Sequence, residues 1–272
     1  MIYIGINPVI FSVGSVEVRW YGVMVVLAIL AIIAITLVEA KRVGVSLDHI
    51  YSLAVWAIIG GVVFSRVVHV IDKWDYYMAN PRQIITFEGL AVYGAVIGIV
   101  IAVLLYCIAK KLSAWQIADL VSPGALVGMA IGRVGCLING CCYGAVTSVP
   151  WAVVYTNPAS YAPLGTPLHP TQVYHFIWNL AAFVVVWLLR RRLKPVGSIF
   201  LLYLALYALG DLGIRFLREG EPFLFGIQQA QLIGIIMLVI TVPLLIFRMY
   251  RARHMASVND SPGELTGPGQ SQ

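Results

Sequence analysis

The chain has 272 residues, of which 60% are hydrophobic and 11% are charged. A soluble domain of this length cannot bury so much apolar surface, so the composition excludes an ordinary soluble globular protein and predicts a chain solvated by lipid. The net charge of +6 would suggest an anionic partner in a soluble protein, but here the basic residues gather in short runs after apolar segments. Such runs are topology signals of a membrane protein, and we expect no nucleic-acid partner.

Seven windows are apolar and long enough to cross a bilayer, which takes about 20 residues per helix. They are 18–39, 50–71, 90–109, 115–138, 171–189, 197–217 and 226–247. The preceding segment, 1–15, lacks the positively charged start of a signal peptide, so we expect insertion without cleavage. The sequence thus predicts an all-α integral membrane protein with seven transmembrane helices.

The distribution of positive charge predicts the orientation of these helices. If the N-terminus lies outside, the loops after the first, third, fifth and seventh windows are cytoplasmic and hold 11 of the 18 Lys and Arg residues. These are Lys41, Arg42, Lys110, Lys111, Arg190, Arg191, Arg192, Lys194, Arg248, Arg251 and Arg253. This bias obeys the positive-inside rule, so we expect a cytoplasmic C-terminus.

Two outer loops, 72–89 and 139–170, are long enough to fold, and we expect them to form a short arm and a head over the helix ends. Residues 1–253 then make one transmembrane domain. The stretch 254–272 is rich in Ser, Pro and Gly and predicts a disordered cytoplasmic tail. Because no internal repeat is visible, a small-solute permease with inverted halves is disfavoured.

The fourth window carries the clearest functional candidate, Arg133. Three glycines spaced four residues apart precede it and let a neighbouring helix or a lipid headgroup approach the backbone. They are Gly124, Gly128 and Gly132. An arginine in a spanning helix costs about 2.5–3.5 kcal/mol on insertion scales, so it should face the protein interior or a wet cavity. Two interpretations stay open: a buried ion pair with Asp119 or Asp211, or a phosphate ligand, whose geometry the guanidinium fork matches.

The sixth window holds Asp211 and Arg215 four residues apart, on one helical face, with Arg218 about one turn further out. Mutual neutralisation is the expected role of the first two. Arg218 has no such partner on its own helix, apart from the nearby Glu219 and Glu221. It is therefore the better candidate to line one cavity with the arginine of the fourth window.

The chain leaves the fourth window through a glycine-rich turn, 132–144. This turn resembles the signature of bacterial prolipoprotein diacylglyceryl transferases and matches it at Arg133, Asn139 and Gly144. The resemblance continues in order along most of the chain, and length, spans and topology agree with it. Further matches are Asn7, Pro8, Arg19, Trp20, Tyr21, Gly22, Ser65, Arg66, Gly89, Leu90, Gly94, Gly98, Asp119, Pro123, Gly124, His169, Pro170, Thr171, Gln172, Arg218 and Gln231.

The resemblance implies transfer of the diacylglyceryl group of phosphatidylglycerol to the lipobox cysteine thiol of a preprolipoprotein, with release of glycerol phosphate, as the first step of lipoprotein maturation. It implies a multi-pass protein of the bacterial plasma (inner) membrane, surrounded by membrane lipids, with its active site toward the outer face and with no cofactor or metal. The expected catalytic residues are Arg133, Arg218, Tyr93 and His169. The expected substrate-binding residues are Tyr21, Arg66, Arg133, Asn139, Gly144 and Gln172.

The chain departs from the family pattern at several positions, including Asp211 and Arg215, whose charges are exchanged, and His175, which replaces a glutamate. Cys136 stands at a family asparagine, Cys141 at a glutamate, and Tyr93 at a histidine of the third window. The general base is therefore open, because tyrosine, with a pKa near 10, is a poor base at neutral pH. His169 and His175, at the outer start of the fifth window, can each accept a proton.

Three roles are open for the cluster of Cys136, Cys141 and Cys142: a structural disulfide, a soft metal site, or a thiol that takes up the lipid covalently before passing it on. The Cys-x4-Cys-Cys spacing is not a standard zinc pattern, and thiols that face a periplasm tend to oxidise. A disulfide or the packing of small side chains is favoured. The alternative function is that of a divergent relative that binds or transfers another lipid, or uses these cysteines for metal or redox chemistry.

Overall fold

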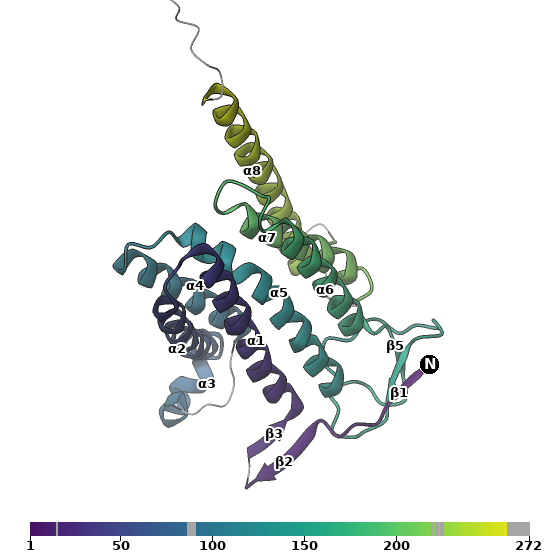
Figure 1. The fold of residues 1–272 in the computed structure, drawn as a ribbon. Helices are drawn as coiled ribbons and strands as arrows, with labels where there is room; N and C mark the ends of the chain where they lie inside the picture. The colour runs from purple at the N-terminus through teal and green to yellow at the C-terminus, as the bar shows by residue number, and fades with distance from the viewer. Residues whose placement is uncertain (15, 86–90, 219, 221–222, 224–225, 260–272) are drawn as a thin grey trace, which may run out of the picture.

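The computed structural model describes the chain except residues 15, 86–90, 219, 221–222, 224–225 and 260–272. Seven of the helices in this described part are long and apolar enough to cross a membrane (Figure 1). They are α1 (Trp20–Val43), α2 (Leu47–Asp72), α4 (Val92–Ala109), α5 (Ala114–Asn139), α6 (Thr171–Leu189), α7 (Ser198–Arg215) and α8 (Gln229–Asn259). Each overlaps one predicted window, so the seven-helix membrane class is confirmed.

Helix α5 contacts α1, α4, α6 and α7, and its glycines allow α1 to come close. A Cβ added at Gly124 would lie 2.9 Å from the carbonyl oxygen of Ile32 on α1. At Gly128 it would lie 2.7 Å from the Ile32 side chain, whereas at Gly132 it would meet nothing within 4 Å. Two of the three predicted glycines therefore allow α1 to pack closely against α5. The third leaves open space directly before Arg133.

Helices α2 and α4 pack against each other and lie to one side of α5 (Figure 1). Their backbones meet at Gly60 and Gly98, where a Cβ would collide with the facing carbonyl. Between α4, α5 and α7 lies a cavity of about 480 Å³, lined mainly by apolar side chains. It extends from Ala114 to Ala125 along α5.

The carboxylate of Asp119 on α5 holds the start of α7. Its two oxygens accept hydrogen bonds from the backbone N–H of Gly197, at 2.5 Å, and of Phe200, at 2.8 Å. These N–H groups have no partner inside the helix, so a carboxylate satisfies them well. Of the two open interpretations of Arg133, an ion pair with Asp119 is therefore not observed among the described residues.

The segments after α2 and α5 fold as an arm and a head. Residues 139–170 contribute β4 (Val153–Tyr155) and β5 (Pro167–Leu168), and β1 (Ile2–Ile4) joins them by pairing parallel with β4. The strands β2 (Val9–Val13) and β3 (Val16–Arg19) form a hairpin that leads into α1. The arm contains α3 (Trp74–Ala79) and the 3-10 helix η1 (Pro81–Ile85). Gly89 and Leu90 of the predicted arm and third window lie outside the described residues.

Helix α8 ends later than its apolar window. It continues to Asn259, so the first part of the predicted disordered tail, 254–259, is helical. Good helix formers such as Ala252 and Ala256 extend the helix after the apolar residues have ended. Residues 260–272 lie outside the described residues.

The close approach of α1 to α5 predicts opposite effects for one substitution at two sites on the same helix. Gly124→Ala should destabilise the protein by about 1–3 kcal/mol, because its Cβ meets backbone that cannot move alone. Gly132→Ala is the matched control and should be neutral or stabilising, because alanine is the better helix former. Thermal unfolding in detergent should therefore begin at a lower temperature only for Gly124→Ala; equal unfolding temperatures would contradict the packing described.

Candidate functional site

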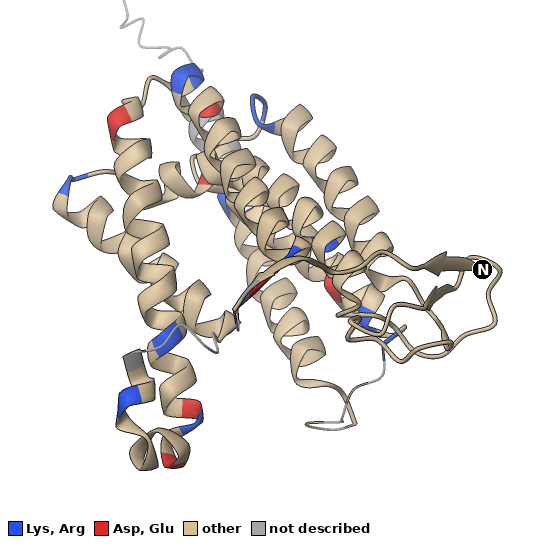
Figure 2. Cartoon of the chain, turned by 90° about the horizontal axis from the view of Figure 1, so that it is seen from below, with Lys and Arg blue, Asp and Glu red and all other residues tan. Residues whose placement is uncertain are grey.

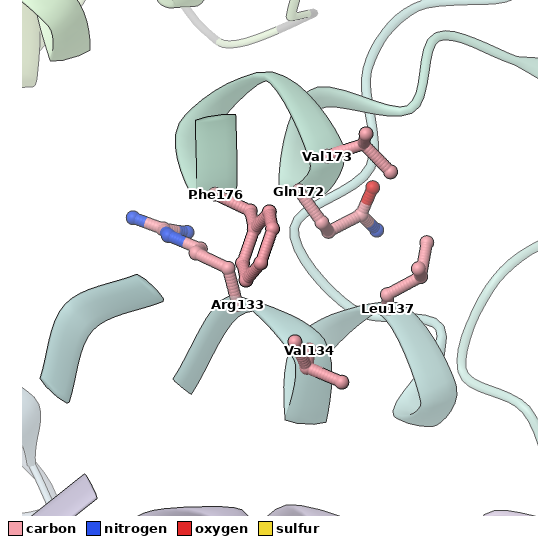
Figure 3. Close-up of a pocket in the computed structure, with 6 residues that line it drawn as sticks. All are labelled: Arg133, Val134, Leu137, Gln172, Val173 and Phe176. Atoms are coloured by element: carbon pink, nitrogen blue, oxygen red, sulfur yellow. The ribbon is translucent and has the colours of Figure 1, made fainter. Parts of the chain in front are cut away.

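Arg133 lies on α5, roughly 9 Å from the helix end at 1.5 Å per residue. It is half-buried, and within the described residues its side chain has no hydrogen bond or ion pair. It borders a small cavity of about 170 Å³ between α5 and α6, where it extends past the ring of Phe176 (Figure 3). Most Lys and Arg residues lie at helix ends or in loops, and few interrupt the spans (Figure 2). The guanidinium is thus free to bind an anion.

Arg218 follows α7 and comes to the same region as Arg133. Both arginines are within electrostatic reach of Cys142 and of His175. The Arg218 backbone is fixed, because its carbonyl accepts a hydrogen bond from Gln228 Nε2 at 3.0 Å. No described residue forms a hydrogen bond or ion pair with its side chain, while Glu219 and Glu221 lie outside the described residues. We call Arg133, Arg218, Cys142 and His175 the arginine site.

Asp211 and Arg215 form the predicted ion pair. The Arg215 Nε donates to Asp211 Oδ2 at 2.6 Å, and the carboxylate is almost fully buried. The pair confirms the expected neutralisation on α7. Because Asp211 is held by Arg215, the other predicted partner of Arg133 is also excluded.

The turn after α5 is shaped by side chains from α6. Gln172 Nε2 donates to the carbonyl of Cys141 at 2.7 Å, and Thr171 Oγ1 donates to the carbonyl of Cys142 at 2.6 Å. Cys142 has a φ of +60°, a left-handed conformation that costs a non-glycine residue energy. Gly144 N donates to the carbonyl of His169 at 2.9 Å, and a Cβ at Gly144 would lie 2.5 Å from the Leu217 carbonyl oxygen. Gln172 and Gly144 therefore hold this turn against α6 and the segment after α7.

All three cysteines of this turn are free thiols, so the favoured disulfide is not formed. Their sulfur atoms lie within 4.8 Å of one another. Hydrogen bonds from the Cys136 and Cys141 thiols, together with the positive charges of Arg133 and Arg218, lower the pKa of Cys142. The neighbouring thiols and the two arginines therefore favour the thiolate form of Cys142.

Cys141 titrates in the opposite direction. Its hydrogen bond with Cys136 lowers the pKa of Cys141, but the hydrogen bond with Cys142 and burial raise it more. The surroundings therefore favour ionisation of Cys142 over ionisation of Cys141.

The other predicted residues fall into two groups. Tyr21 on α1 and Tyr93 on α4 are exposed at the membrane side of the site: Tyr21 is within electrostatic reach of Arg133, and Tyr93 of Tyr207 on α7. Asn139, Arg66 and His169 instead hold outer segments in place. Asn139 Oδ1 accepts from Arg19 at 3.2 Å, Arg66 Nε donates to the Ile84 carbonyl of the arm at 2.9 Å, and His169 Nδ1 lies 3.3 Å from the Tyr174 hydroxyl.

Two features of the site went beyond the sequence prediction. Arg19 ties β3 to the turn through Asn139, and its guanidinium lies over the ring of Tyr161. His175 lies beside Asp211, with its Nε2 3.8 Å from Asp211 Oδ1. Arg19 was indicated only by its place in the matched series, and His175 only by its place in a span that carries polar residues. Their contacts could not be predicted, because the rotation of two helices about their axes decides which side chains meet.

Seven spans around a cationic site at membrane depth define a multi-pass membrane protein suited to an anionic lipid or ligand. The family model of prolipoprotein diacylglyceryl transferase matches residues 8–247. The phosphatidylglycerol–prolipoprotein diacylglyceryl transferase of Dehalococcoides mccartyi is 41% identical over 254 residues, covering 93% of this chain and 98% of its own. The enzymes of the same name from Trichormus variabilis and Clostridium tetani are 33% and 36% identical, covering 94% and 79% of this chain and 94% and 86% of their own.

The chain therefore belongs to the prolipoprotein diacylglyceryl transferase family. It is a transferase of the membrane, and the expected resemblance is confirmed. The alternative of a divergent relative with another activity is not favoured.

The lowered pKa of Cys142 predicts that its thiol reacts with iodoacetamide at acidic pH. A thiol with the ordinary pKa of about 8.5 loses close to tenfold in rate per pH unit below that value, because only the thiolate reacts. Cys142 should instead keep its rate down to about pH 6. Peptide mass spectrometry after timed alkylation measures this, with Cys142→Ser as the control for site assignment. A tenfold fall per pH unit at Cys142 would contradict the described thiolate.

Proposed function

We propose that the protein transfers the diacylglyceryl group of phosphatidylglycerol to the lipobox cysteine thiol of preprolipoproteins at the outer face of the bacterial plasma membrane, releasing glycerol phosphate. The observation that carries the proposal is the pair of guanidinium groups, Arg133 and Arg218, which have no ion-pair partner among the described residues. The family membership supports a lipid phosphate as the anion.

The two arginines suit a phosphodiester that becomes a leaving group. A guanidinium binds phosphate oxygens through two parallel N–H groups and stays charged at every physiological pH. As the bond between the glyceryl carbon and the phosphate oxygen breaks, negative charge grows on that oxygen. Fixed positive charge from α5 and from the segment after α7 stabilises this charge more than it stabilises the intact lipid.

The large cavity between α4, α5 and α7 fits the acyl chains of the donor. It begins at Ala125, which is roughly 12 Å along α5 from Arg133 at 1.5 Å per residue. One leaflet of the hydrocarbon core is about 15 Å thick. A lipid whose phosphate contacts Arg133 therefore directs its chain ends into this apolar space.

The acceptor thiol needs to lose its proton before it attacks. A free cysteine has a pKa of about 8.5, and nearby positive charge lowers it. Cys142 lies in the field of Arg133 and Arg218, which contributes to the lowering of its pKa. A lipobox thiol brought to the same field is activated in the same way.

The remaining predicted residues divide between contact and support. We assign Tyr21 and Tyr93 to the lipid headgroup, because both are exposed near the arginine site. Asn139, Gly144 and Gln172 keep the turn in shape. Arg66 fixes the arm, and the contact of His169 with Tyr174 favours a structural role in the head.

Purified protein incubated with phosphatidylglycerol and a lipobox peptide should give a thioether-linked diacylglyceryl adduct on the peptide cysteine, detected by mass spectrometry. Arg133→Ala should reduce the rate by about 100-fold or more, since it removes charge stabilisation of the leaving phosphate. Arg82→Ala, an exposed arginine of the arm, is the matched control and should keep the wild-type rate. Absence of adduct with the wild-type protein, where a known transferase succeeds, would refute the function.

The proposed orientation places the arginine site outside and the C-terminus in the cytoplasm. A fluorescent protein that folds only in the cytoplasm should therefore fluoresce when fused after Gln272 of the full chain. Alkaline phosphatase, which is active only outside, should be inactive at the same position. Active phosphatase together with a dark fluorescent protein would reverse the topology and place the site on the cytoplasmic side.

A further inference from the structure

Two buried polar atoms face each other beside the arginine site without a hydrogen-bond partner. They are Nε2 of His175 on α6 and Oδ1 of Asp211 on α7, 3.8 Å apart. The side chains are 3% and 8% exposed. A separation of 3.8 Å is too long for a direct hydrogen bond, yet leaving such groups unpaired in a protein interior is unfavourable. A functional occupant that supplies a hydrogen between them would remove this cost.

The surroundings place this pair at the depth of the arginine site. His175 is about one turn inside the start of α6, and Asp211 about one turn before the end of α7. The charged groups that face the His175 ring are Arg133 from α5, Asp211 and Arg215 from α7, and Arg218 after α7. The donor phosphate proposed for Arg133 and Arg218 therefore lies beside the same imidazole.

We propose that His175 is the catalytic base of the transfer, with its Nε2 taking the proton of the acceptor thiol, and that Asp211 positions the imidazole. This inference rests on the proposed function and deepens it. An imidazole with an unpaired ring nitrogen can accept a proton from a thiol placed against that nitrogen. Arg215 holds the other oxygen of Asp211, which fixes the carboxylate relative to the histidine.

In the proposed reaction, the S–H proton of the lipobox cysteine passes to His175 Nε2, and the sulfur lone pair forms a C–S bond to the glyceryl carbon of the lipid. The C–O bond to the phosphate breaks, and its electron pair leaves on the phosphate oxygen beside Arg133 and Arg218. The protonated imidazole then returns its proton to the departing glycerol phosphate.

Other candidate bases are worse placed or chemically weaker. A tyrosine hydroxyl is a poor base at neutral pH, and Tyr93 is 64% exposed on α4. His169 belongs to the head, where its ring meets the Tyr174 hydroxyl. Asp211 has one oxygen committed to Arg215 at 2.6 Å. His175 lies within electrostatic reach of both Arg133 and Arg218.

The test is the pH dependence of adduct formation by the full-length protein in detergent or nanodiscs. His175→Gln should lower kcat by at least about 100-fold, the usual contribution of a general base, and should remove the acidic limb of the pH profile. His175→Ala should regain part of its activity when free imidazole is added, because the added base enters the space of the lost ring. His49→Gln, whose ring meets Tyr106 on α4, is the matched control and should behave as wild type.

A purely structural role for His175 would also lower activity in the variants. The pH profile and the imidazole rescue therefore distinguish a structural role from that of a catalytic base. Loss of rate with an unchanged acidic limb and no response to imidazole would overturn the proposal, as would a wild-type rate in His175→Gln. Asp211→Asn should lower kcat while leaving KM for the peptide close to that of the wild type, since the residue positions the base. The two proposals fail separately: a wild-type protein that forms no adduct refutes the transferase function itself, whereas adduct formation indifferent to His175 refutes only this inference.

Discussion

The cost of holding an uncompensated guanidinium inside a membrane-spanning helix is the constraint that organises this protein. Arg133 sits on α5, within the spans, and no described residue forms an ion pair with it. The two carboxylates considered as its partners have other contacts: Asp119, on the same helix, holds the start of α7, and Asp211 on α7 pairs with Arg215. The helix also leaves open space at Gly132. Arg133 is thus kept available, and in the proposed function the phosphate of an anionic lipid is its partner.

The rest of the outer half supports this availability. Gly124 and Gly128 bring α1 against α5, so Tyr21 reaches the region of Arg133. The turn after α5 is fixed from α6 by Thr171 and Gln172, and its thiols respond to the same positive field that would act on the acceptor cysteine. The head strands join residues far apart in the chain, and Arg19 ties the amino-terminal hairpin to this turn. Packing, electrostatics and proposed catalysis therefore converge at one end of α5.

The spans and the ion pair could be predicted from the sequence, but the contacts between helices could not. Apolar length alone locates seven helices, and a spacing of four places Asp211 beside Arg215 on one face. The role of Asp119 could not be read in this way, since its partners are backbone N–H groups almost eighty residues away. The approach of His175 to Asp211 could not be predicted either, because it depends on how α6 and α7 are rotated about their axes. Because thiols that face a periplasm tend to oxidise, the sequence favoured a disulfide among the cysteines. In the structure they are free thiols around Cys142.

The most direct measurement of the central claim is an experimental structure of the protein in a lipid nanodisc with a phosphonate analogue of phosphatidylglycerol that cannot be cleaved. The account predicts that the phosphonate oxygens accept hydrogen bonds from Arg133 and Arg218 at about 2.8 Å, with the acyl chains running toward the cavity between α4, α5 and α7. A phosphonate that binds elsewhere and contacts neither guanidinium group would contradict the proposed role of Arg133 and Arg218.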